Sequence, residues 1–134
     1  MSNNNPSLYP ALVLAYMGDA VYEVFTREKL LGEHPDMPAH KLHKINVHYV
    51  RAKAQSNAMA AIEPILTEEE LAIYKRGRNA KAGTVPKNAD LVDYRRATGF
   101  ETLVGYLHLK KEFDRLNEIM EIAFQSAEDK NQEE

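Results

Sequence analysis

Residues 12–27 read LVLAYMGDAVYEVFTR, an apolar segment with a Gly-Asp pair at its middle and a glutamate one helical turn later. The spacing of its apolar residues predicts a helix over residues 8–31. Its predicted buried side consists of Leu14, Met17, Val21, Val24 and Phe25. Glycine inside a helix costs about 1 kcal/mol relative to alanine, and a carboxylate removed from water needs a partner. Gly18, Asp19 and Glu23 therefore call for a structural or chemical reason.

The same periodicity extends over the rest of the chain and predicts an all-α fold. Further helices are expected over about 38–62 and 67–78, from about Asp90, and over about 110–127. Residues 67–70, TEEE, predict a capping box with Thr67 as the N-cap and Glu70 reaching back to it. Residues 77–88, rich in Gly, Asn and Lys, predict a loop. We expect one folded domain over 8–127, with disordered ends at 1–7 and 128–134.

Composition narrows the class of protein. A chain of 134 residues suggests one domain with a modest core. The chain has no cysteine, which excludes disulfides, cysteine-ligated zinc and thiol chemistry. No apolar run approaches the roughly 20 residues of a membrane span, and the start, MSNNNPS, lacks the regions of a signal peptide. The sequence predicts a soluble cytoplasmic protein without a membrane partner.

The net charge of −3 hides an uneven distribution. Residues 118–134 hold six acids and one base, whereas 75–96 hold seven bases and two acids. Residues 38–60 hold four bases and no acid. An acidic end therefore masks a basic body, and the local pattern favours a polyanionic partner. For 38–60 alone, a solvated charged face remains the alternative.

Two isolated acids occupy similar settings on two predicted helices. Asp19 follows Gly18, and Glu101 lies between Gly99 and Gly105 in 97-ATGFETLVGYL-107. If the two helices cross there, Asp19 and Glu101 meet, and a cation between them would offset their repulsion. Oxygen ligands point to Mg²⁺ or Mn²⁺ rather than zinc. The alternative for each acid is structural, either a solvated carboxylate or a partner of a nearby arginine.

Glu23 lies four residues after Asp19 and four before Arg27, so it shares a helix face with both. It is either an additional ligand or only the ion-pair partner of Arg27.

The segment 75-KRGRNAK-81 contains four cations within seven residues and is followed by Lys87. Cations, amides and backbone N–H groups on such a segment are typical phosphate contacts. No aromatic residues interleave with them, which favours a duplex read by its backbone over stacked single strands. The predicted RNA-contacting residues are Lys75, Arg76, Arg78, Asn79, Lys81 and Lys87.

Three blocks in order resemble the catalytic domain of the ribonuclease III family. They are 12-LVLAYMGDAVYEVFTR-27, 74-YKRGRNAKAGTVPKNAD-90 and 94-YRRATGFETLVGYLHL-109. The closer resemblance is to the Mini-ribonuclease III branch, which lacks a double-stranded-RNA-binding domain. The resemblance covers most of residues 9–125, and GDAV alone would be a weak signal.

This resemblance implies a dimeric helical bundle and a Mg²⁺-dependent endoribonuclease that leaves 5′-phosphate and 3′-hydroxyl ends. The implied substrate is double-stranded or structured RNA, typically precursor 23S ribosomal RNA, cut by metal-activated water. Asp19 and Glu101 match two family acids. The other two fall on Ala15 and Thr98, and Glu23 or Asp90 could substitute for them. The missing acids support a rival function, that of a non-catalytic RNA-binding or ribosome-assembly protein.

Overall fold

The computed structural model describes residues 5–81 and 84–133, and these residues form α-helices and short 3-10 helices without a strand. The predicted all-α fold is confirmed. In chain order the elements are η1 (Pro6–Leu8), α1 (Ala11–Glu33), α2 (Ala39–Val50), α3 (Ala52–Ile62), η2 (Glu63–Ile65), α4 (Glu68–Asn79), α5 (Leu91–Leu109) and α6 (Phe113–Glu133). Over the described residues, we find no helix with the length and apolar character needed to span a bilayer.

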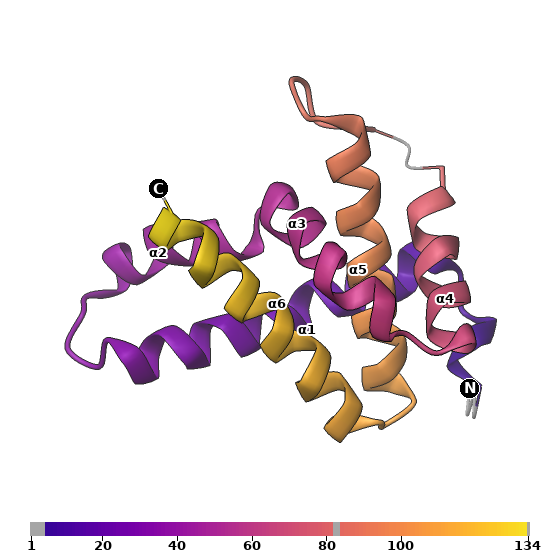
Figure 1. Ribbon diagram of the computed structural model, residues 1–134, viewed down its shortest axis with the longest axis horizontal. Helices are drawn as coiled ribbons and strands as arrows, with labels where there is room; N and C mark the ends of the chain where they lie inside the picture. The colour runs from indigo at the N-terminus through magenta and orange to yellow at the C-terminus, as the bar shows by residue number, and fades with distance from the viewer. Residues whose placement is uncertain (1–4, 82–83, 134) are drawn as a thin grey trace.

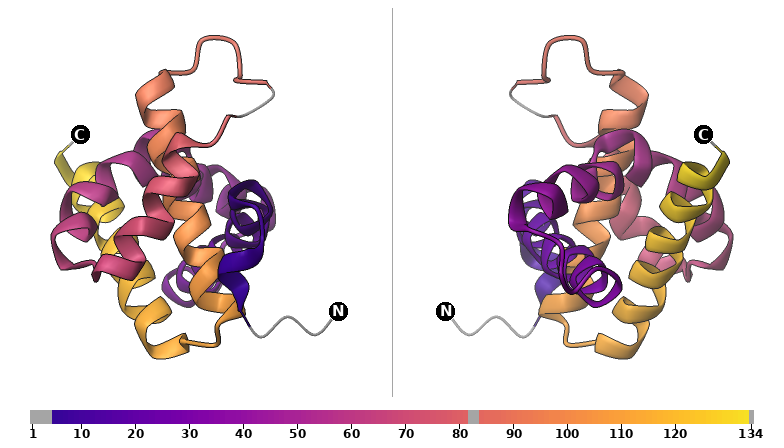
Figure 2. Two further views of the ribbon diagram at one scale, coloured as in Figure 1. Left: turned by 90° about the vertical axis from the view of Figure 1, so that its right-hand side faces the viewer. Right: turned by 90° about the vertical axis from the view of Figure 1, so that its left-hand side faces the viewer.

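Helix α5 is the centre of the fold. It packs most extensively against α1 and α4 and also contacts α3 and α6. Figure 1 shows α5 crossing α1 with α4 alongside, and the two views of Figure 2 show the other helices arranged around it. The run Thr102–Leu107 is buried on every side, as expected of a helix enclosed by others. Residues in the middle and later turns of α5 are therefore held in place by several neighbours.

The core divides into two clusters. In the larger one, Tyr22 of α1 meets Phe100 of α5 edge to face, with ring centroids 5.0 Å apart. In the smaller one, Tyr49 of α2 stacks on Phe124 of α6 at 4.5 Å. Aromatic pairs of this kind contribute about 0.5–1.5 kcal/mol beyond the burial of their area.

The predicted capping box at the start of α4 is confirmed. The Glu70 N–H donates to Thr67 Oγ1 at 3.1 Å, and the Thr67 N–H donates to Glu70 Oε1 at 2.9 Å. Glu70 also accepts from Arg115 of α6 at 2.8 Å, and this hydrogen bond lowers the pKa of the Glu70 carboxyl. The cap therefore also ties α4 to α6.

The prediction of a single helix over 38–62 is wrong. Arg51 has an extended backbone, with φ −64° and ψ 154°, and separates α2 from α3. No Pro or Gly marks the break, so the local sequence gives no signal for it. The break lets Tyr49 enter the smaller cluster while Met59 and Ile62 enter the larger one. Tertiary packing on two separate clusters overrides the local helical preference.

The predicted buried side of the first helix is partly wrong. Leu14 is fully buried, but Val24 is 56% exposed and the other three predicted residues are half-buried. The buried line is Leu14, Ala15, Gly18, Tyr22, Thr26 and Leu30. Apart from Ala15, these residues follow four-residue steps through Gly18, the point at which α1 meets α5. The contact at Gly18 thus sets which side of α1 faces the core. The spacing of the apolar residues alone does not predict this side.

The ends of the chain differ from the sequence prediction. Helix α6 continues to Glu133, where disorder was expected from 128, and Gln125 donates to Asp129 one turn on at 3.0 Å. At the start, Asn5 caps η1 by accepting from the Ser7 N–H at 3.1 Å. Residues 1–4 and 134 lie outside the described residues. The predicted loop begins after Asn79, and its residues 82–83 also lie outside the described part.

Candidate active site

Helices α1 and α5 touch backbone to backbone at two glycines. A Cβ at Gly18 would lie 1.8 Å from the carbonyl oxygen of Glu101. A Cβ at Gly105 would lie 1.9 Å from the carbonyl oxygen of Leu14. Neither position can hold a side chain unless the helices separate. The glycine beside Asp19 therefore serves the helix crossing, and the crossing brings Asp19 next to Glu101.

The predicted meeting of Asp19 and Glu101 occurs in the structure. Asp19 is exposed and Glu101 is half-buried, and their carboxyl groups lie within hydrogen-bonding reach. Burial, followed by the negative charge of Asp19 and the hydrogen bond with it, raises the pKa of Glu101 from 4.5 to about 8. Near neutral pH, Glu101 therefore holds a proton that a bound cation would replace. The pair lies at the surface, where a large substrate can reach it.

Glu23 has the ion-pair role with Arg27 that the sequence left open, and its role as an additional ligand stays a prediction. Its carboxylate accepts from Arg27 Nε at 3.1 Å and from Asn46 Nδ2 at 2.9 Å. Its charge also helps to raise the pKa of Glu101. Glu23 is thus the partner of Arg27 and, at the same time, a member of the acidic cluster.

Two buried amides beneath this cluster were missed by the sequence analysis. Gln55 of α3 donates to Glu101 Oε2 at 3.4 Å and to the Val50 carbonyl at 3.0 Å. Asn46 of α2 donates to Glu23. Amide donors support carboxylates without adding a positive charge that would compete with a metal ion. The available signal was a set of amides within a basic, acid-free stretch, and the two that reach the acids lie on opposite sides of the break at Arg51.

The side-chain oxygens of these amides, Asn46 Oδ1 and Gln55 Oε1, are buried and have no hydrogen-bond partner in the described part of the chain. Because the Gln55 NH₂ group contacts the Val50 carbonyl, which only accepts, the orientation of this amide is fixed. An unpaired buried oxygen costs about 1–3 kcal/mol. Buried polar atoms without a protein partner call for an explanation, and their position beside the acids is consistent with a functional site.

The predicted RNA-contacting residues separate into different settings. Lys75, Arg76, Arg78 and Asn79 belong to the last turns of α4, whereas Lys81 and Lys87 lie in the segment that follows. Arg76 donates to the carbonyls of Ser7 and Tyr9 at 2.9 and 2.8 Å. It therefore anchors the N-terminal segment in this structure, and the structure does not group it with the other cations.

Comparison with known proteins gives a consistent result. The sequence profile described as Ribonuclease III domain matches residues 12–112. The chain belongs to the ribonuclease III family. A Mini-ribonuclease 3 from Clostridium tetani is 49% identical, covering 92% of this chain and 82% of its own length. One from Enterococcus faecalis is 51% identical over 81% of this chain and 83% of its own length.

Structural comparison agrees with this family assignment. The crystal structure of protein FN1578 from Fusobacterium nucleatum superposes with a TM-score of 0.79 at 31% identity, covering 88% of this chain and 93% of that one. As a ribonuclease III family member with relatives named Mini-ribonuclease 3, the chain is an endoribonuclease that acts on RNA. The alternative function, that of a non-catalytic RNA-binding or ribosome-assembly protein, is not supported.

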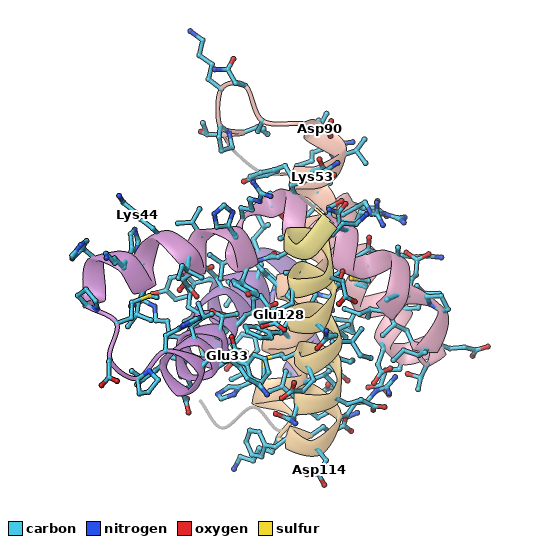
Figure 3. All side chains as sticks on the ribbon, turned by 60° about the vertical axis from the view of Figure 1, so that its left-hand side comes forward. Glu33, Lys44, Lys53, Asp90, Asp114 and Glu128 are labelled. Carbon is cyan, nitrogen blue, oxygen red and sulfur yellow. The ribbon has the colours of Figure 1, made fainter. Side chains whose placement is uncertain are left out.

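Positions where this family member departs from the family pattern have plain structural roles. Ala15 is buried on α1, and the Thr98 hydroxyl donates to the Tyr94 carbonyl at 3.0 Å. Asp90 accepts from the Asp93 N–H as the N-cap of α5, at the top of that helix in Figure 3. It lies eleven residues from Glu101, about 16 Å along a helix. The structure does not bring Asp90 to the acidic pair.

The acidic pair suits a cation that keeps most of its water. In the described residues, no three His, Cys, Asp or Glu side chains converge as a complete metal site. Mg²⁺ commonly binds through one or two carboxylates and retains several waters. Two neighbouring carboxyl groups fit such an ion, and burial, followed by the negative charge of Asp19, raises the pKa of Glu101 to about 8. The donor set is all oxygen, which disfavours soft metals.

Proposed function

We propose that this endoribonuclease acts as a homodimer on double-stranded or structured RNA with Mg²⁺ as cofactor, Mn²⁺ being a possible substitute. The proposed substrate is precursor 23S ribosomal RNA, in the cytoplasm, as the family resemblance implies. The main support for this proposal is the pair of Asp19 and Glu101 at the surface, which the crossing of α1 and α5 brings together.

The proposed catalytic and metal-holding residues are Asp19 and Glu101, with Glu23 as an auxiliary acid. When bound, Mg²⁺ supplies an activated water and stabilises charge on the scissile phosphate. Glu101 would hold the ion as a deprotonated carboxylate, and Gln55 holds that carboxyl group in place. Glu23, oriented by Asn46 and Arg27, keeps the local charge negative. Asp90, far along α5, becomes the weaker auxiliary candidate.

The proposed RNA contacts are the cations and the amide around the end of α4. Lys75, Arg78, Asn79, Lys81 and Lys87 are available from that side, and Arg76 would first have to leave its two carbonyls. Cationic contacts with the RNA backbone give binding that weakens steeply with salt. Sequence preference should be modest, because the A-form major groove is too narrow to read.

An apolar stripe on α1 supports the proposed homodimer. Val13, Tyr16 and Val24 are 43%, 80% and 56% exposed. At about 100° per residue they share one side of α1 with Ala20 and Leu31. Exposed apolar residues gathered on one helix face, here interrupted by Arg27 between Val24 and Leu31, are typical of a contact with another protein surface. A two-fold dimer through this stripe would place two acidic pairs in one assembly, one for each RNA strand.

The test is cleavage of a precursor 23S RNA fragment and of a generic duplex by the purified protein, with and without Mg²⁺. We expect metal-dependent cuts on both strands, with 5′-phosphate and 3′-hydroxyl ends. Asp19→Asn should abolish cleavage while RNA binding remains. Equal cleavage by Asp19→Asn would remove the acidic pair from catalysis, and cutting of the generic duplex alone would remove precursor 23S RNA as the preferred substrate.

A further inference from the structure

A hollow of about 450 Å³ lies between α4 and the first turns of α5. Three arginines reach it: Arg78 from α4, and Arg95 and Arg96 from α5. Its remaining lining residues are Glu63, Tyr74, Asn79 and Val92. We call Arg78, Arg95 and Arg96 the arginine triad. Over the part of the chain that the structure describes, neither Arg95 nor Arg96 forms an ion pair with Glu101.

The arginine triad has no acidic partner within 4.0 Å among the described residues, although Glu63 lines the same hollow. Arg78 donates to Asn79 Oδ1 at 3.2 Å and lies over the Tyr74 ring at 5.8 Å. Arg78 and Arg96 are half-buried. Half-buried like charges repel unless an anion lies between them. Among the residues that line the hollow, three arginines outweigh the single carboxylate of Glu63, so the hollow has the positive charge of an anion site.

The packing of α4 against α5 brings the arginine triad together. Gly77 precedes Arg78, and a Cβ at Gly77 would lie 2.9 Å from the Gly99 Cα on α5. Gly99 follows Arg95 and Arg96 by about one helical turn. The close approach of the two helices thus fixes the spacing between Arg78 and the two arginines of α5.

The triad and the acidic pair face different directions. At about 100° per residue, Arg95 and Arg96 lie about 120° and 140° around α5 from Glu101. An anion at the triad is therefore separated from the negative charges of Asp19 and Glu101 by the helix itself. Planar guanidinium groups bind phosphate oxygens in pairs, which gives direction as well as strength.

We propose that the arginine triad is a phosphate-binding site, and that its occupant is a backbone phosphate of the RNA substrate outside the cleavage centre. The choice of RNA as the source rests on the proposed function. A free phosphate-type oxyanion shares the same chemistry and is the alternative source. The site extends the RNA footprint from the end of α4 to the side of α5 that faces away from the acids.

The first arm of the test uses inorganic phosphate without RNA or metal. In the wild-type protein, titration should shift the side-chain Nε–Hε NMR signals of the triad. Arg78→Gln and Arg96→Gln, which keep part of the side-chain stem, should lose this response and keep their fold by circular dichroism. Wild-type triad signals that do not move with phosphate would overturn the site, whatever the protein does with RNA.

The second arm measures binding of a duplex RNA at several salt concentrations, without metal so that no cleavage occurs. Each lost phosphate contact reduces the slope of log K against log[salt] by about 0.9. Arg78→Gln with Arg96→Gln should therefore flatten the slope by about two. Lys111→Asn, in the turn after α5 where φ is 64°, removes one remote charge and should leave the slope unchanged. Asparagine tolerates that backbone conformation.

The two arms separate the sources of the anion and separate this site from the catalytic proposal. A phosphate response with an unchanged RNA slope would overturn RNA as the occupant and assign the site to a free oxyanion. Flattening of the slope in the double variant with a normal Lys111→Asn control would support RNA. Failure of the wild-type protein to cleave any RNA would contradict the proposed function. The phosphate titration would still decide whether the arginine triad binds an oxyanion.

Discussion

Gly18 on α1 and Gly105 on α5 pack against each other's helix backbones, and this contact sets the geometry of the acidic pair. A Cβ at Gly18 would meet the carbonyl oxygen of Glu101, the residue whose carboxyl group faces Asp19. The glycine contact and the catalytic geometry are therefore one feature of the fold. A change that separates the helices also separates the acids.

Gly18→Ala and Gly105→Ala should each destabilise the protein by about 2 kcal/mol or more, because the new methyl group meets backbone that cannot rotate away. Cleavage should fall in the fraction that still folds. Gly32→Ala is the matched control, since a Cβ there has nothing within 4 Å. It should be neutral or stabilise by up to about 1 kcal/mol. Thermal unfolding measures the stability of each variant. A Gly18→Ala protein as stable as wild type would contradict the backbone contact.

Stability of the metal-free protein should fall as pH rises from about 4.5 to 8. The folded pKa of Glu101 is raised from 4.5 to about 8, so the folded state holds a proton that the unfolded state releases. The stabilisation is complete below the unfolded pKa and is lost as pH passes through the folded one, by about 1–3 kcal/mol.

Glu101→Gln tests this pH effect, because glutamine does not titrate. The variant should lack this part of the pH dependence and should be more stable than wild type at pH 8 and above without metal. Urea unfolding at several pH values measures it. Adding Mg²⁺ should raise the stability of the wild-type protein at high pH and should not raise that of Glu101→Gln. Parallel pH profiles for both proteins would show that Glu101 is an ordinary carboxyl group.

Gln55→Leu should weaken cleavage about tenfold or more by lowering kcat, with little change in KM for RNA, because Glu101 loses its amide donor. Mn²⁺ affinity measured by calorimetry without RNA should fall as well. Ser56→Ala is the control, since the buried Ser56 hydroxyl has no partner in the described region. It should match wild type in both measurements. A Gln55→Leu protein with normal Mn²⁺ binding would contradict a positioning role.

Val24→Asp should convert the proposed dimer into a monomer, because it places a charge in the exposed apolar stripe of α1. Light scattering would measure the mass, and cleavage of both strands should become uncoupled or be lost. Phe113→Asp, at the start of α6 and 54% exposed in wild type, is the control and should keep the wild-type mass. A wild-type protein that is monomeric at micromolar concentration would contradict the dimer.

Arg76→Gln should act mainly on stability. It removes two hydrogen bonds to the carbonyls of Ser7 and Tyr9, at a cost of about 1 kcal/mol, and should speed hydrogen exchange in residues 5–10. The salt slope of RNA binding should change less than for Arg78→Gln. If Arg76→Gln instead flattens the slope without lowering the unfolding temperature, Arg76 is an RNA contact.

The sequence predicted the helical class, the capping box at Thr67 and the pairing of Asp19 with Glu101. The helix class follows from periodicity and the cap from adjacent residues, so both are local. The acidic pair was predictable because a small residue beside an isolated acid occurs on both helices. The roles of Gln55 and Asn46 were not predictable, because their partners lie on other helices and a break that no local residue marks separates them.

The sequence by itself determined the all-α class, most of the helical segments and which acids stand alone in apolar surroundings, since these depend on short-range spacing. Only the tertiary structure decided the rotation of α1, the amides beneath the acids, and the division of the basic residues into an anchor at Arg76 and a triad around Arg78. These depend on how helices approach one another. That approach is set by backbone contact at glycines and by core packing between residues far apart in the chain.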